Sequence, residues 1–136
     1  MSPAARRRIG STRLAGSCHC GAVTLDVPRP PAWVGACNCS LCRRLGTLWA
    51  YYSDAEVSLE GATIPYVWGD RTISIHHCAV CGCTTHWQSI GIDFGRMAVN
   101  ARLLDSDLAG IEIRPQENAE REIGGSSPAL VGPLPK

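Results

Sequence analysis

The segment Gly16-Ser17-Cys18-His19-Cys20-Gly21-Ala22-Val23 decides how this chain folds, because it places two cysteines in a turn too compact for a regular element. On a flat strand, two cysteines separated by one residue stand too far apart to share a metal ion, given a rise of about 3.3 Å per residue. They can chelate only where the backbone turns tightly, and Gly21 permits such a turn. The segment therefore predicts one half of a metal site.

A second turn far along the chain, Cys78-Ala79-Val80-Cys81, supplies the other half. Zinc binds thiolate sulfurs at about 2.3 Å in a tetrahedron, so ligand sulfurs should lie roughly 3.8 Å apart. Such a zinc would clasp the two ends of a sheet and contribute directly to folding. The alternative is a set of ordinary buried cysteines. The predicted ligands are Cys18, Cys20, Cys78 and Cys81.

A third cluster, Cys37-Asn38-Cys39-Ser40-Leu41-Cys42, places three cysteines within one turn of chain. Three protein ligands with a vacant fourth position are typical of a catalytic zinc. Ser40 could cap a single helical turn that runs to Leu45 and ends at Gly46. Two alternatives stay open: an iron–sulfur cluster and a closed site with a fourth protein ligand. That ligand could be Cys83, His19, His76, His77 or His86.

Composition favours a cytoplasmic metal-thiolate protein. The chain has 136 residues, eight cysteines and a formal net charge of +1. It carries neither the apolar core of a signal peptide nor an apolar run long enough to span a membrane. In a reducing compartment, eight cysteines favour metal thiolates over disulfides. The near-neutral charge argues against nucleic acid as a partner. Lys136 is the only lysine, which argues against Schiff-base chemistry.

Short alternating segments separated by glycine and proline predict a mainly β domain with one short helical turn. We expect a flexible N-terminal tail over residues 1–12, one zinc-binding domain over 13–115, and a flexible C-terminal tail over 116–136. Strands are expected at 13–17, 22–27, 48–52, 57–59, 64–68, 72–76, 84–88, 96–101 and 111–113.

The three-cysteine ligand set indicates a reaction class. Three thiolates donate enough charge to make zinc a poor Lewis acid and a weak generator of hydroxide. A metal-bound thiol loses its proton, so the site suits an exogenous thiol that attacks a small electrophile. The deaminase pattern H-x-E and the protease pattern H-E-x-x-H are both absent from the sequence. The pattern therefore favours a thiol substrate over hydrolysis.

Four segments together resemble the glutathione-dependent formaldehyde-activating enzyme family, which also includes the centromere protein V type domain. The resemblance covers roughly residues 13 to 115. The segments are G-S-C-H-C-G-A-V at 16–23, C-N-C-S-L-C-R-R at 37–44, the turn Cys78-Ala79-Val80-Cys81-Gly82, and N-A-R-L-L at 100–104.

This resemblance implies a β-tent of short antiparallel sheets and two zinc ions per chain. The structural zinc would be held by Cys18, Cys20, Cys78 and Cys81, and the catalytic zinc by Cys37, Cys39 and Cys42. The implied activity is that of a carbon–sulfur lyase, which adds glutathione to formaldehyde and gives S-(hydroxymethyl)glutathione. Because only three thiolates hold the second zinc, we expect it to be the more labile of the two.

Candidate substrate contacts lie close to the second cluster. Glutathione carries two carboxylates, and Arg43 and Arg44 could attract them. Asn100 and Arg102 are polar residues in an apolar strand and could line the cleft. The alternatives are solvent exposure for Arg43 and Arg44 and structural hydrogen bonds for Asn100 and Arg102. Other candidates are Trp49, Tyr51 and Trp68 as pocket walls or core, and His76 or His77 as a proton shuttle.

The leading functional hypothesis is a zinc-dependent carbon–sulfur lyase that uses glutathione, or a similar small thiol, and a small aldehyde. The alternative is a non-catalytic zinc-binding module that holds a thiol or a protein partner. A nucleic-acid-associated zinc module is a third reading, which the charge disfavours. No membrane partner is expected, and a homo-oligomer is compatible with the sequence.

Overall fold

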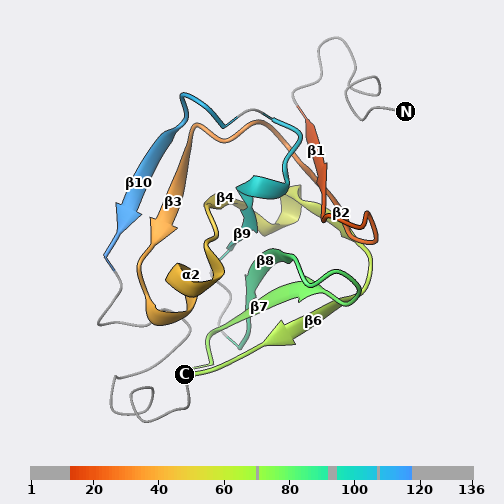
Figure 1. Cartoon of the computed structure of the whole chain (residues 1–136), viewed down its shortest axis with the longest axis vertical. Helices are drawn as coiled ribbons and strands as arrows, with labels where there is room; N and C mark the ends of the chain where they lie inside the picture. Colours follow the sequence, from red (N-terminus) through yellow and green to blue (C-terminus); the bar gives the residue numbers. More distant parts are fainter. Residues whose placement is uncertain (1–12, 70, 92–94, 107, 118–136) are drawn as a thin grey trace.

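The computed structural model describes residues 13–69, 71–91, 95–106 and 108–117 (Figure 1). Of the two predicted tails, only Gln116 and Glu117 fall within this part of the chain. The strands are β1 (Leu14–Ser17), β2 (Thr24–Val27), β3 (Trp33–Cys37), β4 (Trp49–Ser53), β5 (Ser58–Glu60), β6 (Thr63–Tyr66), β7 (Ile73–Cys78), β8 (Thr84–Ser89), β9 (Arg96–Asn100) and β10 (Glu112–Gln116). The helices are α2 (Ser40–Leu45) and the 3-10 turns η1 (Asp54–Glu56) and η2 (Ala101–Leu103).

The strands form two sheets, which confirms the prediction of a mainly β fold. A three-stranded sheet has the order β1-β2-β5, and a seven-stranded sheet has the order β10-β3-β4-β9-β8-β7-β6. Figure 1 shows β10 and β3 at one side of the molecule and β1 and β2 at the other. All named strand pairs are antiparallel except β10 with β3, which is parallel.

Three elements differ from the sequence prediction. The strand β3 was not predicted, because the prolines before it indicated only a stiff connector. Strand β10 continues to Gln116, one residue past the expected domain boundary at 115. The helix α2 occupies the predicted residues and ends at Gly46, but its N-cap is Cys39 rather than Ser40. No helix in the described ranges is long and apolar enough to cross a membrane.

Successive side chains of a strand point to opposite sides, so the seven-stranded sheet has two faces with different side chains. On β4, Ala50 and Tyr52 pack into a core shared with Leu14, Leu25 and Val27 of the smaller sheet. Trp49 and Tyr51 point to the opposite face, where the three-cysteine cluster lies. We call this second face the site face. Each face therefore carries its own cluster of buried side chains, and the three cysteines belong to the second.

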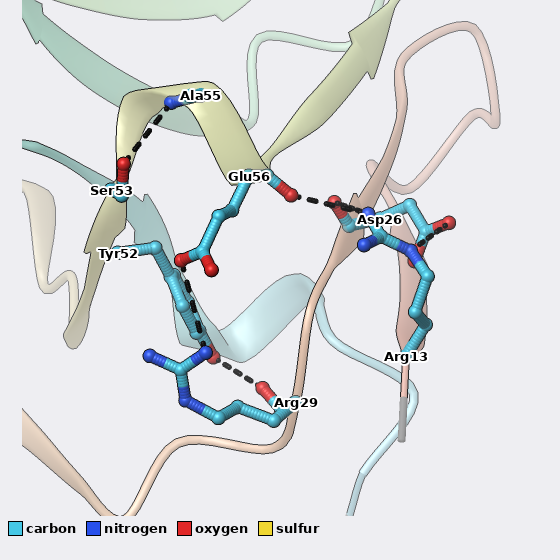
Figure 2. A network of polar contacts seen from close by, with 7 residues as sticks. All are labelled: Arg13, Asp26, Arg29, Tyr52, Ser53, Ala55 and Glu56. Carbon is cyan, nitrogen blue, oxygen red and sulfur yellow. Dashed lines mark hydrogen bonds and ion pairs between the residues drawn. The ribbon is translucent and has the colours of Figure 1, made fainter. Parts of the chain in front are cut away.

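A polar network supports the packing of the two sheets at a distance from the cysteines (Figure 2). Arg13 on the chain entering β1 contacts Asp26 of β2 at 3.2 Å and the carbonyl oxygen of Glu56 at 3.2 Å. The hydroxyl of Tyr52 donates to the carbonyl oxygen of Arg29 at 2.8 Å. The ion pairs in this network are partly exposed and contribute at most about 1 kcal/mol each. The network therefore assists a junction that the apolar core dominates.

Candidate metal centres and active site

The four-cysteine cluster joins the two sheets. Cys18 and Cys20 lie in the turn after β1, Cys78 ends β7, and Cys81 lies in the turn before β8. The Sγ of Cys20 is 3.7 Å from the Sγ atoms of both Cys18 and Cys78. All four sulfurs lie within 4.8 Å of one another. The sequence predicts a four-cysteine site between two ends of one sheet, but the site connects the three-stranded sheet to the seven-stranded sheet.

Backbone N–H groups turn toward these sulfurs. Val23 N lies 3.3 Å from the Sγ of Cys18, and Val80 N lies 3.3 Å from the Sγ of Cys78. The turns that allow this contain Gly21 at φ 84° and Gly82 at φ 83°, a conformation that favours glycine. Hydrogen bonds from the backbone N–H groups of Cys83 and Cys20 lower the pKa of Cys81 to about 5. The backbone thus stabilises thiolate, the form that binds a metal ion.

Cys83 lies beside this first cluster. It is half-buried and packs with Cys81 against Cys18, Val23 and Cys78. Its sulfur is not among the four that lie within 4.8 Å of one another. Cys83 is therefore a neighbour of the four-cysteine site and does not complete the three-cysteine site.

The three-cysteine cluster is built where β3 becomes α2. Cys37 ends β3, Cys39 caps α2, and Cys42 lies inside the helix. Their sulfurs lie within 4.8 Å of one another. Cys42 N donates to the Sγ of Cys39 at 3.3 Å, so the capping bond of the helix also orients a ligand. Trp49 Nε1 donates to the Sγ of Cys42 at 3.4 Å.

None of the side chains proposed as a fourth ligand joins this cluster in the described part of the chain. His76 and His86 stack with ring centroids 4.4 Å apart. On β7 His76 follows Ile75, and on β8 His86 precedes Trp87, and the side chains of Ile75 and Trp87 lie on the site face. Because successive side chains of a strand point to opposite faces, both histidines lie on the other face of the sheet. His19 lies between Cys18 and Cys20, and His77 precedes Cys78. The geometry favours the interpretation of a site with three protein ligands.

The donor set of this cluster fits a cation. The neighbouring sulfur of Cys37 raises the pKa of Cys39, and the sulfurs of Cys37 and Cys39, together with burial, raise the pKa of Cys42. Three thiolates so close together repel one another, and a divalent cation between them would reverse this effect. Both clusters could therefore hold metal ions, and the sulfur distances suit zinc.

The surroundings of the three-cysteine cluster are apolar and largely closed. Cys37, Cys39 and Cys42 are 9%, 0% and 7% exposed, so only a small part of the Cys37 and Cys42 side chains faces solvent. Trp49 and Trp68 are buried in the same cluster of side chains, and Tyr51 packs against it half-buried. The three predicted aromatic residues thus serve as core and as walls of the site at once.

The four predicted substrate contacts differ in what they already bind. Arg43 is exposed on α2, and its guanidinium has no partner among the described residues. Arg44 donates to the carbonyl oxygen of Ser40 at 2.7 Å. The side-chain amide of Asn100 donates to the carbonyl oxygen of Thr84 at 2.9 Å, and Arg102 donates to that of Gly46 at 2.9 Å. The bonds of Asn100 and Arg102 are the kind expected if these side chains make structural hydrogen bonds and do not contact a substrate.

Two residues on the site face were missed by the sequence analysis. Arg96 of β9 places its guanidinium 5.2 Å from the ring centroid of Tyr51. Gln116 of β10 accepts a hydrogen bond from the Tyr51 hydroxyl at 3.0 Å. Strand register pairs Gln116 with Cys37 and brings Arg96 to Tyr51, which packs against the cysteine cluster. Neither residue lies near a cysteine in the sequence. Only the pairing of β9 with β4 and of β10 with β3 reveals them.

The fold and the two clusters define a class: a mainly β protein in which one closed and one three-ligand cysteine site could hold metal ions. The model of the glutathione-dependent formaldehyde-activating enzyme family matches residues 13–120, and the chain belongs to this family. A crystal structure of a Rhodobacter sphaeroides protein is similar, with 30% identity and a TM-score of 0.65. The match covers 75% of this chain and 98% of that one. A search of curated proteins gives no significant match.

Proposed function

We propose that this protein is a zinc-dependent carbon–sulfur lyase, which adds glutathione or a similar small thiol to formaldehyde or a related small aldehyde. The observation that carries the proposal is the group of three cysteine sulfurs within 4.8 Å, which no fourth ligand joins in the described part of the chain. Membership of the formaldehyde-activating family supports the choice of thiol and aldehyde.

Cys37, Cys39 and Cys42 would hold the catalytic zinc, and Cys18, Cys20, Cys78 and Cys81 the structural zinc. When bound at the three-cysteine site, zinc would favour the deprotonated form of a fourth, exogenous thiol. Backbone and indole N–H groups stabilise negative charge on the ligand sulfurs, as in the bond from Trp49 Nε1 to Cys42. The buried tryptophans keep bulk water away from these sulfurs.

The reaction is an addition in which all atoms are retained. The thiol sulfur forms a bond to the carbonyl carbon, the carbonyl π electrons move to oxygen, and the thiol proton ends on that oxygen. The product is a hydroxymethyl thioether. The protein's contribution is to hold the two small reactants together in a dry, oriented arrangement.

Arg43 and Arg44 remain proposed contacts for the carboxylates of the thiol. The free guanidinium of Arg43 supports this role more directly than the bonded guanidinium of Arg44. Asn100 and Arg102 would reach a substrate only after breaking the hydrogen bonds they make. A cytoplasmic location is proposed because eight cysteines remain thiolates in a reducing compartment.

The test compares Cys39→Ser with the wild-type protein. Serine is also a good N-cap, so α2 should persist and the melting temperature should stay close to that of the wild type. Exchange of ¹³C-formaldehyde with glutathione can be followed by NMR, after subtraction of the spontaneous rate. We expect acceleration by the wild type and none by Cys39→Ser, with Cys83→Ser as a control of normal activity.

Two outcomes would count against the enzyme. Full acceleration by Cys39→Ser would refute the role of the three-cysteine site. A wild-type protein that forms a glutathione complex in native mass spectrometry without accelerating the exchange would support the alternative, a non-catalytic module that holds a thiol.

A further inference from the structure

Strand β10 carries Gln116 onto the site face beside the three-cysteine cluster. Gln116 is the Cα partner of Cys37 in the parallel pair of β10 with β3. Paired residues on neighbouring strands point to the same face of a sheet. The carbonyl oxygen of Gln116 also accepts a hydrogen bond from Asn38 N at 3.1 Å, so this end of β10 is anchored at the residue after Cys37.

A glycine makes room for the carboxamide of Gln116. Gly35 precedes Cys37 by two residues and therefore lies on the same face of β3. A Cβ atom at Gly35 would lie 2.5 Å from Oε1, 2.6 Å from Cδ and 2.8 Å from Nε2 of Gln116. Any side chain at position 35 would displace the carboxamide. The absence of a side chain there lets the amide group lie flat against the sheet.

Tyr51 sets the orientation of this amide. The Tyr51 hydroxyl donates to Oε1 of Gln116 at 3.0 Å, and the Tyr51 ring packs against the cysteine cluster. With Oε1 held in this way, the Nε2 group presents its two hydrogens elsewhere. No acceptor for Nε2 exists among the described residues, and the side chain is half-buried. An oriented, unused N–H donor therefore lies next to the site.

We propose that the Nε2–H of Gln116 donates a hydrogen bond to the aldehyde oxygen and stabilises the negative charge that develops there as the thiol sulfur bonds to carbon. This inference rests on the proposed function. The sulfur–carbon bond forms, the π electrons of the carbonyl move to oxygen, and the thiol proton ends on that oxygen. Gln116 neither gains nor loses a proton.

The expected size of the effect follows from comparable donors. Loss of one buried donor to a developing oxyanion reduces kcat by about 10²–10³-fold. Gln116 is half-buried, and water can partly replace it, so we expect a fall of about ten- to a hundredfold in kcat. The dissociation constant for the thiol should stay within about twofold, because the donor acts on the oxygen of the aldehyde.

The experiment measures kcat, thiol affinity, zinc content and melting temperature for three variants. Gln116→Ala removes the amide, and Gln116→Glu keeps its shape but has no N–H donor at neutral pH. Both should lose kcat, and Gln116→Glu should lose at least as much as Gln116→Ala because its carboxylate repels the developing negative charge. Both should retain two zinc ions, thiol binding and thermal stability. Tyr51→Phe keeps the ring but releases the amide, and should lose only part of this effect.

Three results would overturn the inference. If Gln116→Ala keeps kcat within about twofold, the amide is not used. If Gln116→Glu keeps kcat while Gln116→Ala loses it, the side chain acts by shape. If thiol affinity falls while kcat is unchanged, Gln116 contacts the thiol and not the aldehyde. A wild-type protein without any acceleration would instead overturn the proposed function and this inference with it.

Discussion

Replacement of Cys20 by serine isolates the contribution of the four-cysteine site to stability. Cys20 is exposed, whereas Cys18 and Cys78 are buried, so its substitution removes a ligand with little loss of apolar packing. Its Sγ lies 3.7 Å from the Sγ atoms of both Cys18 and Cys78. Serine keeps the size of the side chain and removes the thiolate that zinc requires.

The expected magnitude follows from the length of the loop that the clasp closes. Cys20 and Cys78 are 58 residues apart in the sequence. The chain-entropy relation for a cross-link closing such a loop predicts about 4 kcal/mol at 25 °C. A domain of this size has a total stability of roughly 5–15 kcal/mol. With about 4 °C per kcal/mol, the melting temperature should fall by about 15 °C.

Differential scanning calorimetry together with zinc content measures this effect, with Cys83→Ser as the matched control. Cys83 lies next to the same cluster but outside the four sulfurs, so its substitution should cost about 1 kcal/mol or less and keep both zinc ions. A Cys20→Ser protein that melts within about 3 °C of the wild type would refute the clasp. Equal losses for the two variants would show that general packing, not metal ligation, is measured.

Two further predictions concern charge. Arg96→Ala should raise the KM for glutathione about fivefold and leave the KM for 2-mercaptoethanol unchanged. The reason is that only glutathione has carboxylates that the Arg96 guanidinium, which lies over the Tyr51 ring, could bind. Equal changes in KM for both thiols would contradict this prediction. Burial, aided by the neighbouring His76, lowers the pKa of His86 to about 4, below its value of about 6.5 in the unfolded chain. The unfolded state therefore binds more protons below pH 6.5, and His86 should cost roughly 2 kcal/mol of stability at pH 5 relative to pH 7. Urea unfolding of His86→Gln should show a correspondingly smaller loss, whereas an identical pH dependence in both proteins would contradict the assignment.

Local features of the sequence predicted much of the candidate site. The spacing of Cys37, Cys39 and Cys42 is short enough that one turn of chain brings their sulfurs together, whatever the rest of the fold does. Gly46 likewise ends α2 at the residue expected, in the left-handed conformation at φ 71°. Such features depend on neighbours in the sequence, and local backbone preferences decide them.

Strand β3 shows where local reasoning fails. The prolines before Trp33 indicate a stiff connector, and Trp33–Cys37 does not show the strict alternation of a half-buried strand. This segment is a strand because β10 and β4 pair with its two edges. The backbone hydrogen bonds that define β3 are made with residues distant in the sequence. The residues on either side of Gly35 therefore do not by themselves predict a strand.

The sequence alone determined which neighbouring cysteines within each turn could share a metal ion, because tight turns and short spacings restrict where their sulfurs can point. It also determined the mainly β class through alternation and turn residues. Only the tertiary structure decided that the four-cysteine site joins two sheets and that His76 and His86 lie on the face away from the three-cysteine site. It also decided that Gln116 pairs with Cys37 and that Arg96 contacts Tyr51. The physical reason is strand register: one set of long-range backbone hydrogen bonds fixes which face every side chain of a strand occupies.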